Sequence, residues 1–275
     1  MKRFSGKTVI ITGSSSGIGR ATAILFAKQG AQVTITGRDA EKLEDTKKVI
    51  LKVTCKPHDL NIVVANLTDP SGLDEIVKST LDKFGKIDIL VNNAGANIAD
   101  GTTNTDQSIE LYHRTFQINF QAVVEMIKKT KNHLIKTKGE IVNVSSVAGD
   151  SQALSATPYY SSAKAALNQY TRCVALDLIQ YGVRVNSVSP GVVSTGFLGA
   201  MGLPDDAKGK VESFMASNKN CIPAGVFGKP NDIAEVILFL ADRKRSSYIV
   251  GQSIVADGGT SLVTGMQAYD IQDMI

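Results

Sequence analysis

The sequence predicts an α/β protein built on one doubly wound parallel sheet of seven strands, with helices on both faces. Three observations favour this class. Strand-like and helix-like segments alternate from end to end, a glycine-rich turn follows the first strand, and 275 residues suit one unbroken domain of this kind. Short β-branched and apolar runs mark the strands, and longer runs of helix-forming residues mark the helices. We expect strands near 7–12, 31–36, 60–65, 87–91, 140–144, 184–188 and 252–256, and helices near 18–29, 39–52, 70–84, 106–137, 159–180 and 231–242.

The first strand runs directly into a glycine-rich turn and then into a helix. The β-branched run from Lys7 to Ile11 is followed by Thr-Gly-Ser-Ser-Ser-Gly-Ile-Gly-Arg and by a helix-like segment that closes at Gly30. Glycine lets the backbone approach a pyrophosphate without an intervening Cβ atom, and a helix amino terminus offers N–H groups to the anion. The spacing Gly-x3-Gly-x-Gly departs from the general dinucleotide fingerprint, so an ordinary Gly/Ser turn remains an alternative. The strand–turn–helix context favours a dinucleotide-binding loop of the Rossmann type.

A tyrosine and a lysine lie four residues apart in Tyr160-Ser-Ser-Ala-Lys164, at the start of a predicted helix. Side chains at this spacing share one helix face, so the phenol and the ammonium can meet in one site. A nearby cation favours the phenolate. We therefore expect Lys164 to lower the pKa of Tyr160 from its usual value of about 10 and to make the phenol a usable acid or base. Taken alone, this pattern is more often a solvated helix face.

Together with further short motifs, the glycine loop and the Tyr160–Lys164 pair resemble the short-chain dehydrogenase/reductase family. The resemblance extends from about Gly6 to Val263, and it is closest to the tropinone-reductase-like, sugar and steroid dehydrogenase branches. Each motif is short, but their shared order is specific. The further motifs are Asn92-Asn93-Ala94-Gly95 after the fourth strand, Asn119 in Gln117-Ile118-Asn119-Phe120, the strand Ile141-Val142-Asn143-Val144-Ser145-Ser146, Pro190-Gly191 after the sixth strand, and Asp257-Gly258-Gly259 after the last.

The resemblance implies four catalytic residues. Tyr160 would exchange the proton and Ser146 would hydrogen-bond the substrate carbonyl, while Lys164 would bind the nicotinamide ribose and Asn119 would hold a relay water. One spacing departs from the family pattern, because Ser146 and Tyr160 are fourteen residues apart instead of the usual thirteen. Tyr159 would restore that distance, but the residue four positions after it is alanine, not lysine. We therefore expect Tyr160 to be the acid and the extra residue to bulge the loop before it.

The end of the second strand indicates which cofactor binds. An acidic residue there would bind the ribose 2′-hydroxyl of NAD, whereas an arginine accommodates the 2′-phosphate of NADP. Gly37 stands where NAD-preferring relatives carry the acid and Arg38 follows it, while Asp39 suits the N-cap of the next helix. The sequence therefore predicts NADP, with Asn66 accepting a hydrogen bond from the adenine. The cofactor-binding set that the resemblance implies is Gly13, Ser15, Ser16, Gly17, Ile18, Gly19, Arg38, Asn66, Leu67, Asn93, Ala94, Gly95, Tyr160, Lys164, Pro190, Gly191, Val193 and Thr195.

Composition argues against several other classes. The net charge is +4 and the basic residues are scattered along helices, so we expect no nucleic-acid partner. Cys55, Cys173 and Cys221 are far apart and lack metal-ligand spacing, so we expect neither a disulfide framework nor a metal site. No apolar run approaches the length of a membrane span, and the first strand begins too early for a signal peptide. We expect a cytoplasmic protein.

These observations predict an NADP-dependent oxidoreductase that transfers hydride between the nicotinamide and a small carbonyl compound or secondary alcohol. One alternative is an NAD-dependent alcohol, sugar or steroid dehydrogenase, against which Arg38 argues. The other is a nucleotide-binding regulator without catalysis, against which the complete catalytic set argues.

Two further expectations concern the rest of the chain. The glycine- and proline-rich segment 192–230 is expected to form a substrate lid, with Phe197, Leu198 and Met201 as its apolar part. Because members of the family are commonly dimers or tetramers, we expect a homo-oligomer, with a homotetramer favoured. It would be built through the long helices 106–137 and 159–180 and the last strand.

Overall fold

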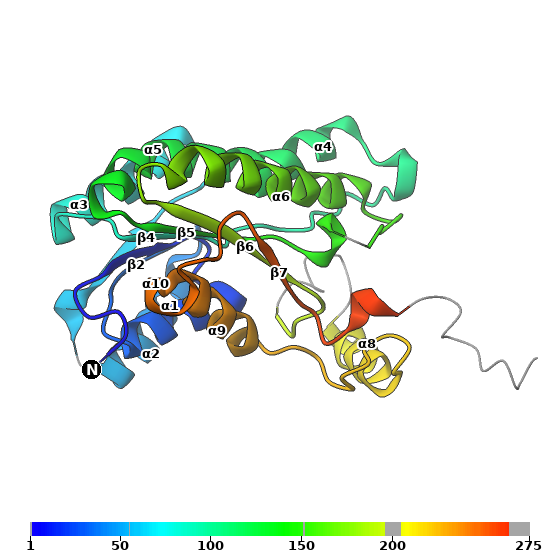
Figure 1. Cartoon of the computed structure of the whole chain (residues 1–275). Helices are drawn as coiled ribbons and strands as arrows, with labels where there is room; N and C mark the ends of the chain where they lie inside the picture. Colours follow the sequence, from blue (N-terminus) through cyan, green and yellow to red (C-terminus); the bar gives the residue numbers. More distant parts are fainter. Residues whose placement is uncertain (1, 55, 151, 196–204, 264–275) are drawn as a thin grey trace, which may run out of the picture.

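The computed structural model describes residues 2–54, 56–150, 152–195 and 205–263. Seven parallel strands form one sheet in the order β3-β2-β1-β4-β5-β6-β7 (Figure 1). The predicted fold class is confirmed, and each strand lies within two residues of its predicted bounds. The strands are β1 (Thr8–Ile11), β2 (Gln32–Gly37), β3 (Leu60–Val64), β4 (Ile89–Asn92), β5 (Glu140–Val144), β6 (Arg184–Pro190) and β7 (Ser253–Ala256).

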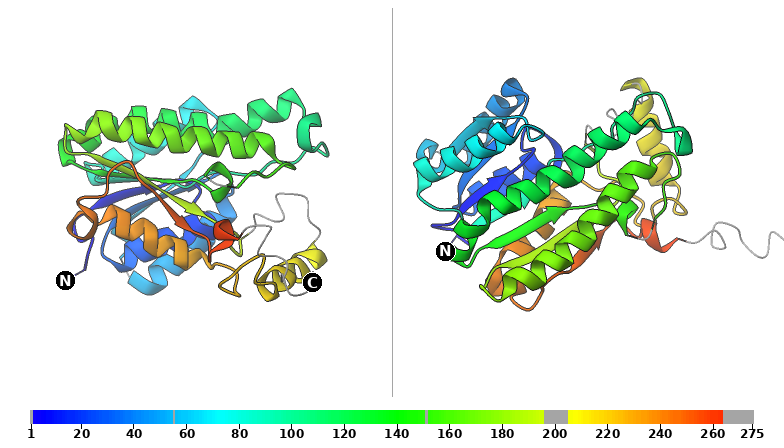
Figure 2. Two further views of the ribbon diagram at one scale, coloured as in Figure 1. Left: turned by 45° about the vertical axis from the view of Figure 1, so that its right-hand side comes forward. Right: turned by 90° about the horizontal axis from the view of Figure 1, so that it is seen from above.

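Helices cover both faces of the sheet. In Figures 1 and 2, α3, α4, α5 and α6 form the layer on one face, and α1, α2, α9 and α10 form the layer on the other. The helices are α1 (Gly17–Lys28), α2 (Ala40–Thr54), α3 (Pro70–Phe84), α4 (Ile109–Phe116), α5 (Ala122–Thr137), α6 (Pro158–Ile179), α8 (Asp205–Ser217), α9 (Pro230–Ala241) and α10 (Arg243–Ser246).

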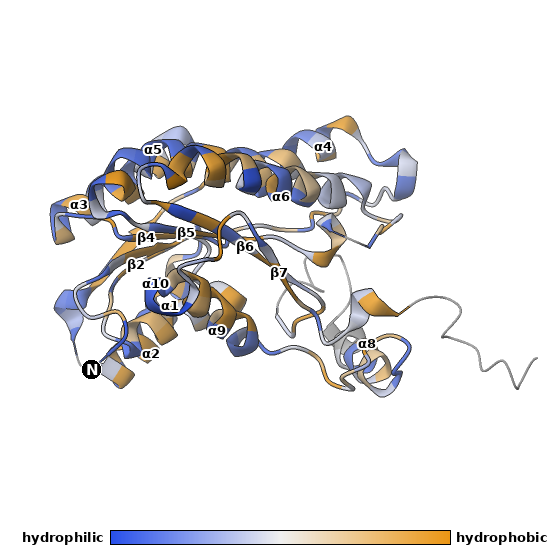
Figure 3. Cartoon of the chain, viewed as in Figure 1, coloured by the Kyte–Doolittle hydropathy of each residue, from blue (hydrophilic) through white to orange (hydrophobic). Residues whose placement is uncertain are grey.

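The central strands are buried because helices pack on both sides of them. Successive side chains point to opposite faces, so Ile10 belongs to the core under α3, α5 and α6, whereas Val9 and Ile11 belong to the core under α1, α2 and α9. Figure 3 shows the apolar strands between helices whose outer faces are polar. Among the described helices, none is both long and apolar enough to cross a bilayer.

The strand order reverses direction between β1 and β4. The chain builds outward from β1 through β2 to β3, then returns and builds the other half from β4 to β7. At such a point the loops after two neighbouring strands diverge and leave a crevice at their carboxyl ends, which is where ligands bind in doubly wound sheets. In this chain the two loops at that point are the glycine loop after β1 and the Asn93-Ala94-Gly95 segment after β4.

Two predicted segments differ from what the structure shows. The helix expected over 106–137 begins at Ile109 and is interrupted at Gln117–Gln121 by a π turn, in which Ala122 N–H donates to the Gln117 carbonyl, five residues back. The expected lid segment contains the helix α8, which was not predicted. The three apolar residues expected in the lid, Phe197, Leu198 and Met201, lie outside the described residues.

Candidate active site

The glycine loop approaches its neighbours so closely that no side chain fits at Gly13 or Gly19. Gly13 and Gly17 have φ angles of 65° and 54°, in the left-handed region that favours glycine. A Cβ atom on Gly13 would lie 2.9 Å from the Ala94 Cα atom, and one on Gly19 would lie 2.3 Å from the Gly13 carbonyl oxygen. The N-cap of α1, Ser16, makes no side-chain capping bond, and the first turn holds no acidic residue. The amino terminus of α1 therefore has no side-chain cap and no acidic residue that would oppose an anion.

The segment after β4 is hydrogen-bonded to this loop. The Thr12 hydroxyl accepts the backbone N–H groups of Asn93 and Ala94, each at 3.0 Å. In return, Asn93 Nδ2 donates to the carbonyls of Thr12 and Gly13 at 2.9 and 3.1 Å. These bonds fix the two loops relative to each other, and they engage the amide nitrogen of Asn93 in holding the loops together.

The hydroxyl groups of Ser146 and Tyr160 meet beyond the carboxyl end of β5. Ser146 follows the end of β5 as the N-cap of a short 3₁₀ turn, where its hydroxyl accepts the Ala148 N–H at 3.2 Å. Tyr160 is the third residue of α6 and is buried, and its hydroxyl is hydrogen-bonded to the Ser146 side chain. The structure therefore brings the predicted serine and tyrosine together despite the extra residue between them.

The prediction that Lys164 lowers the pKa of Tyr160 is wrong for this structure. Burial raises the pKa of Tyr160 to about 12, and the hydrogen bond with Ser146 opposes that rise. The Lys164 ammonium donates to the Val144 carbonyl at 3.0 Å and lies 5.7 Å from the centroid of the Tyr160 ring. At that position it does not outweigh the cost of removing a phenolate from water.

Lys164 is itself buried, and burial lowers its pKa to about 8. A charged ammonium is poorly solvated at this depth, so the neutral amine is favoured more than in water. A Cβ atom on Gly95 would lie 3.2 Å from Lys164 Nζ and 2.7 Å from Asn119 Oδ1. The lysine and the asparagine therefore face the same glycine.

Asn119 lies at the centre of the π turn and is fully buried. Its Nδ2 atom donates to the carbonyls of Ala96 and Thr115 at 2.8 and 2.9 Å, and its Oδ1 atom accepts the Ala96 N–H at 3.1 Å. The amide thus joins the segment after Gly95 to the helix. That it also holds a relay water stays a prediction.

The residues expected to select the cofactor lie at the ends of β2 and β3. Arg38 is exposed directly after β2, and the Asp39 side chain accepts the Lys42 N–H at 3.0 Å as predicted for an N-cap. The Asn66 side-chain oxygen accepts the N–H and the hydroxyl of Thr68 at 3.2 and 3.0 Å. This local turn engages the oxygen that was expected to face the adenine, so its role at the cofactor stays a prediction.

The remaining predicted cofactor residues follow the carboxyl ends of four strands, β1, β3, β4 and β6. Thr195 packs on the glycine loop, because a Cβ atom on Gly17 would lie 3.2 Å from its Cγ2 atom. Leu67 is buried beyond β3, in the core cluster against which Ala94 packs. The others are Gly13, Ser15, Ser16, Gly17, Ile18 and Gly19 after β1, Asn93, Ala94 and Gly95 after β4, and Pro190, Gly191, Val193 and Thr195 at the end of β6 and beyond.

Several residues that position the site were not predicted. Thr12 hydrogen-bonds the segment after β4, as described above. Asn143 on β5 accepts from Asn92 Nδ2 and donates to the Thr171 hydroxyl, each at 2.9 Å, which ties β4 through β5 to α6. A Cβ atom on Gly149 would lie 2.5 Å from the backbone carbon of Lys164. Of these, only Thr12 could have been found from the sequence, because it precedes the first glycine of the loop. Asn143 and Gly149 belong to no pattern that a single sequence shows.

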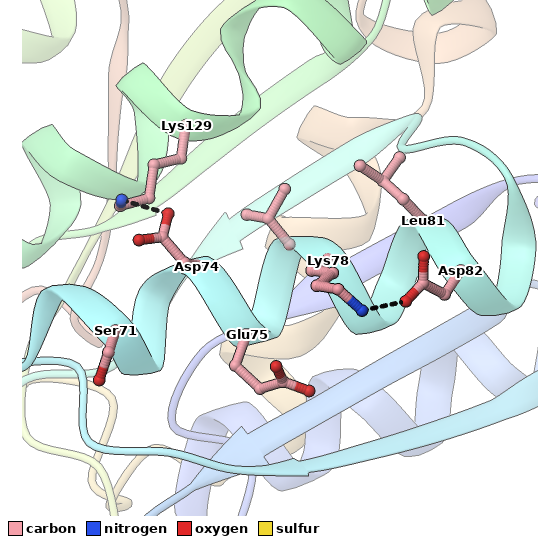
Figure 4. A pocket seen from close by; sticks show the side chains of 8 residues that line it. Ser71, Asp74, Glu75, Lys78, Leu81, Asp82 and Lys129 are labelled. Atoms are coloured by element: carbon pink, nitrogen blue, oxygen red, sulfur yellow. Dashed lines mark hydrogen bonds and ion pairs between the residues drawn. The ribbon is translucent and has the colours of Figure 1, made fainter.

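A groove elsewhere on the surface is separate from this site. It lies between α3 and α5, and Figure 4 shows two ion pairs among its charged side chains, Lys129 with Asp74 and Lys78 with Asp82. None of the predicted site residues lines it. Its lining residues are Ser71, Asp74, Glu75, Val77, Lys78, Leu81, Asp82 and Lys129.

The fold and the site define a Rossmann-type oxidoreductase, and comparison with known proteins supports this class. Residues 13–261 match the family model described as Enoyl-(Acyl carrier protein) reductase. The 3-oxoacyl-(acyl-carrier-protein) reductase of Thermotoga maritima is 37% identical over 258 residues, which cover 94% of this chain and 98% of that protein. The meso-2,3-butanediol dehydrogenase of Serratia marcescens is 33% identical over 263 residues, covering 96% and 98%.

Two solved structures from Caenorhabditis elegans are also similar. A short-chain dehydrogenase/reductase of unknown function, solved with cofactor, is 62% identical with a TM-score of 0.96, and the match covers 98% of this chain and all of that one. A glucose dehydrogenase in its apo form is 55% identical with a TM-score of 0.81, covering 95% of this chain and all of that one. This chain belongs to the short-chain dehydrogenase/reductase family, oxidoreductases that act on CH–OH or C=O groups.

Proposed function

We propose that this protein is an NADP-dependent oxidoreductase that interconverts a small carbonyl compound and its secondary alcohol. The observation that carries this proposal is the hydrogen bond between the partly exposed Ser146 and the buried Tyr160, with the buried Lys164 one helical turn away. The glycine loop after β1 would bind the dinucleotide. The site thus has a proton donor next to a place for the nicotinamide.

Each residue has a role that follows from its surroundings. NADPH, when bound, would supply the hydride. Tyr160 is protonated at neutral pH because its pKa is about 12, so it enters a reduction as the proton donor to the carbonyl oxygen. Ser146 orients that oxygen by a second hydrogen bond. The Lys164 ammonium stabilises the phenolate that remains once the proton has left, and the proton returns through the relay expected at Asn119.

Arg38 supports NADP as the cofactor. It is exposed directly after Gly37, the residue that would be acidic in a protein binding the ribose of NAD. The nearest carboxylate in the sequence, Asp39, caps α2 and is paired with Lys42 at 3.2 Å. The guanidinium is therefore the group best placed to accept a 2′-phosphate.

A second candidate keeps the fold but takes a polyol or sugar as its substrate, oxidised with NAD or NADP. The 55% identity to a glucose dehydrogenase and the match to a butanediol dehydrogenase favour it. The match to a 3-oxoacyl-(acyl-carrier-protein) reductase favours carbonyl reduction instead. The two candidates share the catalytic residues and differ in the direction and the substrate pocket.

We also propose a homo-oligomer assembled through α6, with a tetramer expected. Leu176 on this helix is 78% exposed, although it is large and apolar. Such a side chain is normal singly, so the proposal rests mainly on the family. Light scattering after gel filtration would test it, and a monomer would contradict it. The segment 192–230 remains our proposal for the substrate lid.

The first experiment is a thermal-shift titration with NADPH, NADP, NADH and NAD. We expect stabilisation by the phosphorylated pair in the wild type and a shift toward NAD in Arg38→Asp. Lys48→Asp, an exposed change on the outer part of α2, is the matched control and should keep the wild-type preference. An Arg38→Asp variant with an unchanged NADP/NAD ratio would remove Arg38 from the argument, and no stabilisation by any nucleotide would contradict the enzyme proposal.

Substrate class is tested next with purified protein and either NADPH or NADP. Acetoacetyl-coenzyme A, 2,3-butanedione and levodione probe reduction, and meso-2,3-butanediol and glucose probe oxidation. Turnover of the carbonyl compounds alone supports the first candidate. Faster turnover of glucose or butanediol supports the second.

A further inference from the structure

The tyrosine next to the proposed acid has contacts of its own. Tyr159 and Tyr160 lie in the first turn of α6, which begins at Pro158. The N-cap residue Thr157 makes no side-chain capping bond to this turn. A first turn without such a cap opens readily, because its N–H groups have no partner within the helix. Contacts from outside the helix can therefore help to hold Tyr160 where its hydroxyl meets Ser146.

Tyr159 connects this turn to the loop that precedes α4. Its hydroxyl donates to the Gln107 carbonyl at 3.0 Å. Gln107 is buried, and its Nε2 atom donates to the Ala156 carbonyl at 3.4 Å, just before the helix begins. The ring of Tyr159 also meets the ring of Tyr112 on α4 edge to face, with centroids 5.5 Å apart. Two hydrogen bonds and an aromatic contact thus close around the amino end of α6.

The segment around Gln107, which accepts the hydrogen bond from Tyr159, is itself held in place. The amino terminus of α4 is capped by Ser108, whose hydroxyl accepts the Leu111 N–H at 3.1 Å and donates to the Asp100 carboxylate at 2.6 Å. One turn further on, the rings of Tyr112 and Phe116 lie 4.6 Å apart. The anchor is therefore an ordered helix end and not a single side chain.

Because successive residues in a helix point about 100° apart, the two tyrosine hydroxyls reach different neighbours. We propose that Tyr159 is a positioning residue, which holds the first turn of α6 so that the Tyr160 hydroxyl stays at Ser146. This inference rests on the proposed function of Tyr160 as the proton donor. It also accounts for the Ser146–Tyr160 spacing, since the tyrosine at the usual distance serves as the brace and the next one serves as the acid.

Tyr159→Phe tests the brace because it removes one hydroxyl and keeps the ring. We expect kcat to fall about fivefold, as the loss of one hydrogen bond would give, with the KM for NADPH within twofold of the wild type. Hydrogen–deuterium exchange of the backbone at 158–163 should speed up by a similar factor. Tyr159→Leu also removes the ring contact and should lower kcat further.

Tyr170→Phe is the matched control on the same helix. Its ring meets Phe120 edge to face at 5.6 Å, and its hydroxyl makes no hydrogen bond to any residue in the described ranges. We expect both wild-type kcat and wild-type exchange for this variant. A merely structural role for Tyr159 would lower the yield or the melting temperature while leaving kcat per folded molecule unchanged.

The outcomes separate this inference from the proposed function. Tyr159→Phe with wild-type exchange and wild-type kcat would overturn the brace, while an inactive Tyr160→Phe would still support the acid. If Tyr159→Phe were inactive and Tyr160→Phe active, the acid would be Tyr159 and both ideas would fail. The exchange measurement needs no substrate, so unchanged exchange overturns the brace even if no compound tested is turned over.

Discussion

At the amino edge of the sheet the buried Glu140 carboxylate lies between two arginines, whereas at the carboxyl edge the buried Lys164 ammonium has no carboxylate partner among the described residues. Glu140 is 2.9 Å from Arg184 and 2.6 Å from Arg243. Arg184 is fully buried and also donates to the carbonyls of Leu240, Ser246 and Ile249. Burial still raises the pKa of Glu140 to about 7, against the pull of both arginines.

The carboxyl edge is arranged differently. Lys164 donates to one neutral carbonyl, that of Val144, and burial lowers its pKa to about 8. Nearby, burial raises the pKa of Tyr160 to about 12. Both groups are therefore shifted toward their neutral forms. Buried charged groups that pair with opposite charges usually help to hold the fold together. Buried titratable groups without such partners have shifted pKa values, which are typical of functional sites.

The largest effect should come from the carboxyl edge. Tyr160→Phe removes the proton donor and should lower kcat about 10³-fold, within the range of general acid catalysis. NADPH binding, followed by thermal shift, and the melting temperature without nucleotide should stay near the wild-type values. Near-normal turnover by this variant would show that the two edges do not differ in the way proposed.

At the amino edge, Arg184→Met should act on stability alone. It leaves Glu140 with one cation in place of two and three carbonyls without a donor, and we expect a loss of about 3 kcal/mol in the free energy of unfolding. Urea unfolding measures the loss, and kcat per folded molecule should be unchanged. A large fall in kcat at full folding would mean that the amino edge also contributes to the site.

Lys164→Met should separate stability from activity at the carboxyl edge. The variant loses activity but avoids burying an unpaired ammonium, so at neutral pH it should be more stable than the wild type by about 1 kcal/mol. The folded pKa of about 8 lies below the ordinary 10.5. Between these values the unfolded chain binds more protons, so wild-type stability rises with pH through that window. The advantage of the variant should thus be largest below pH 8 and shrink above it, and a pH-independent difference would contradict the assignment.

The smallest effect on stability should come from an ion pair that lies outside both the Glu140 group and the Lys164 site. Lys131 and Asp177 pair at 3.3 Å on the surface, with both side chains well exposed. Lys131→Met should change the free energy of unfolding by about 0.5 kcal/mol or less, because water already screens such a pair. This variant is also the control for Arg184→Met, and an equal loss in the two would mean that burial does not decide the outcome.

Much of this architecture could be predicted because it depends on local patterns. Each of the seven strands could be placed from β-branched runs, and the N-cap at Asp39 and the close approach at Gly13 follow from the residue types. The order of the motifs identified the family, and with it the residues of the catalytic set. The helix α8 escaped prediction because its segment looked irregular, with glycines and prolines on both sides.

The sequence by itself determined the order of the elements, the family and the identities of the reactive side chains, because periodicity, turn residues and motif spacing are all properties of neighbours along the chain. Only the tertiary structure decided the state of those side chains. The pKa of Tyr160 is raised, not lowered, because distant segments bury the phenol more effectively than one lysine can offset. Likewise, the pairing of Glu140 with Arg184 and of Tyr159 with Gln107 depends on which strands and helices become neighbours in space. Solvation and long-range contact are set by the packed fold, and no local pattern carries them.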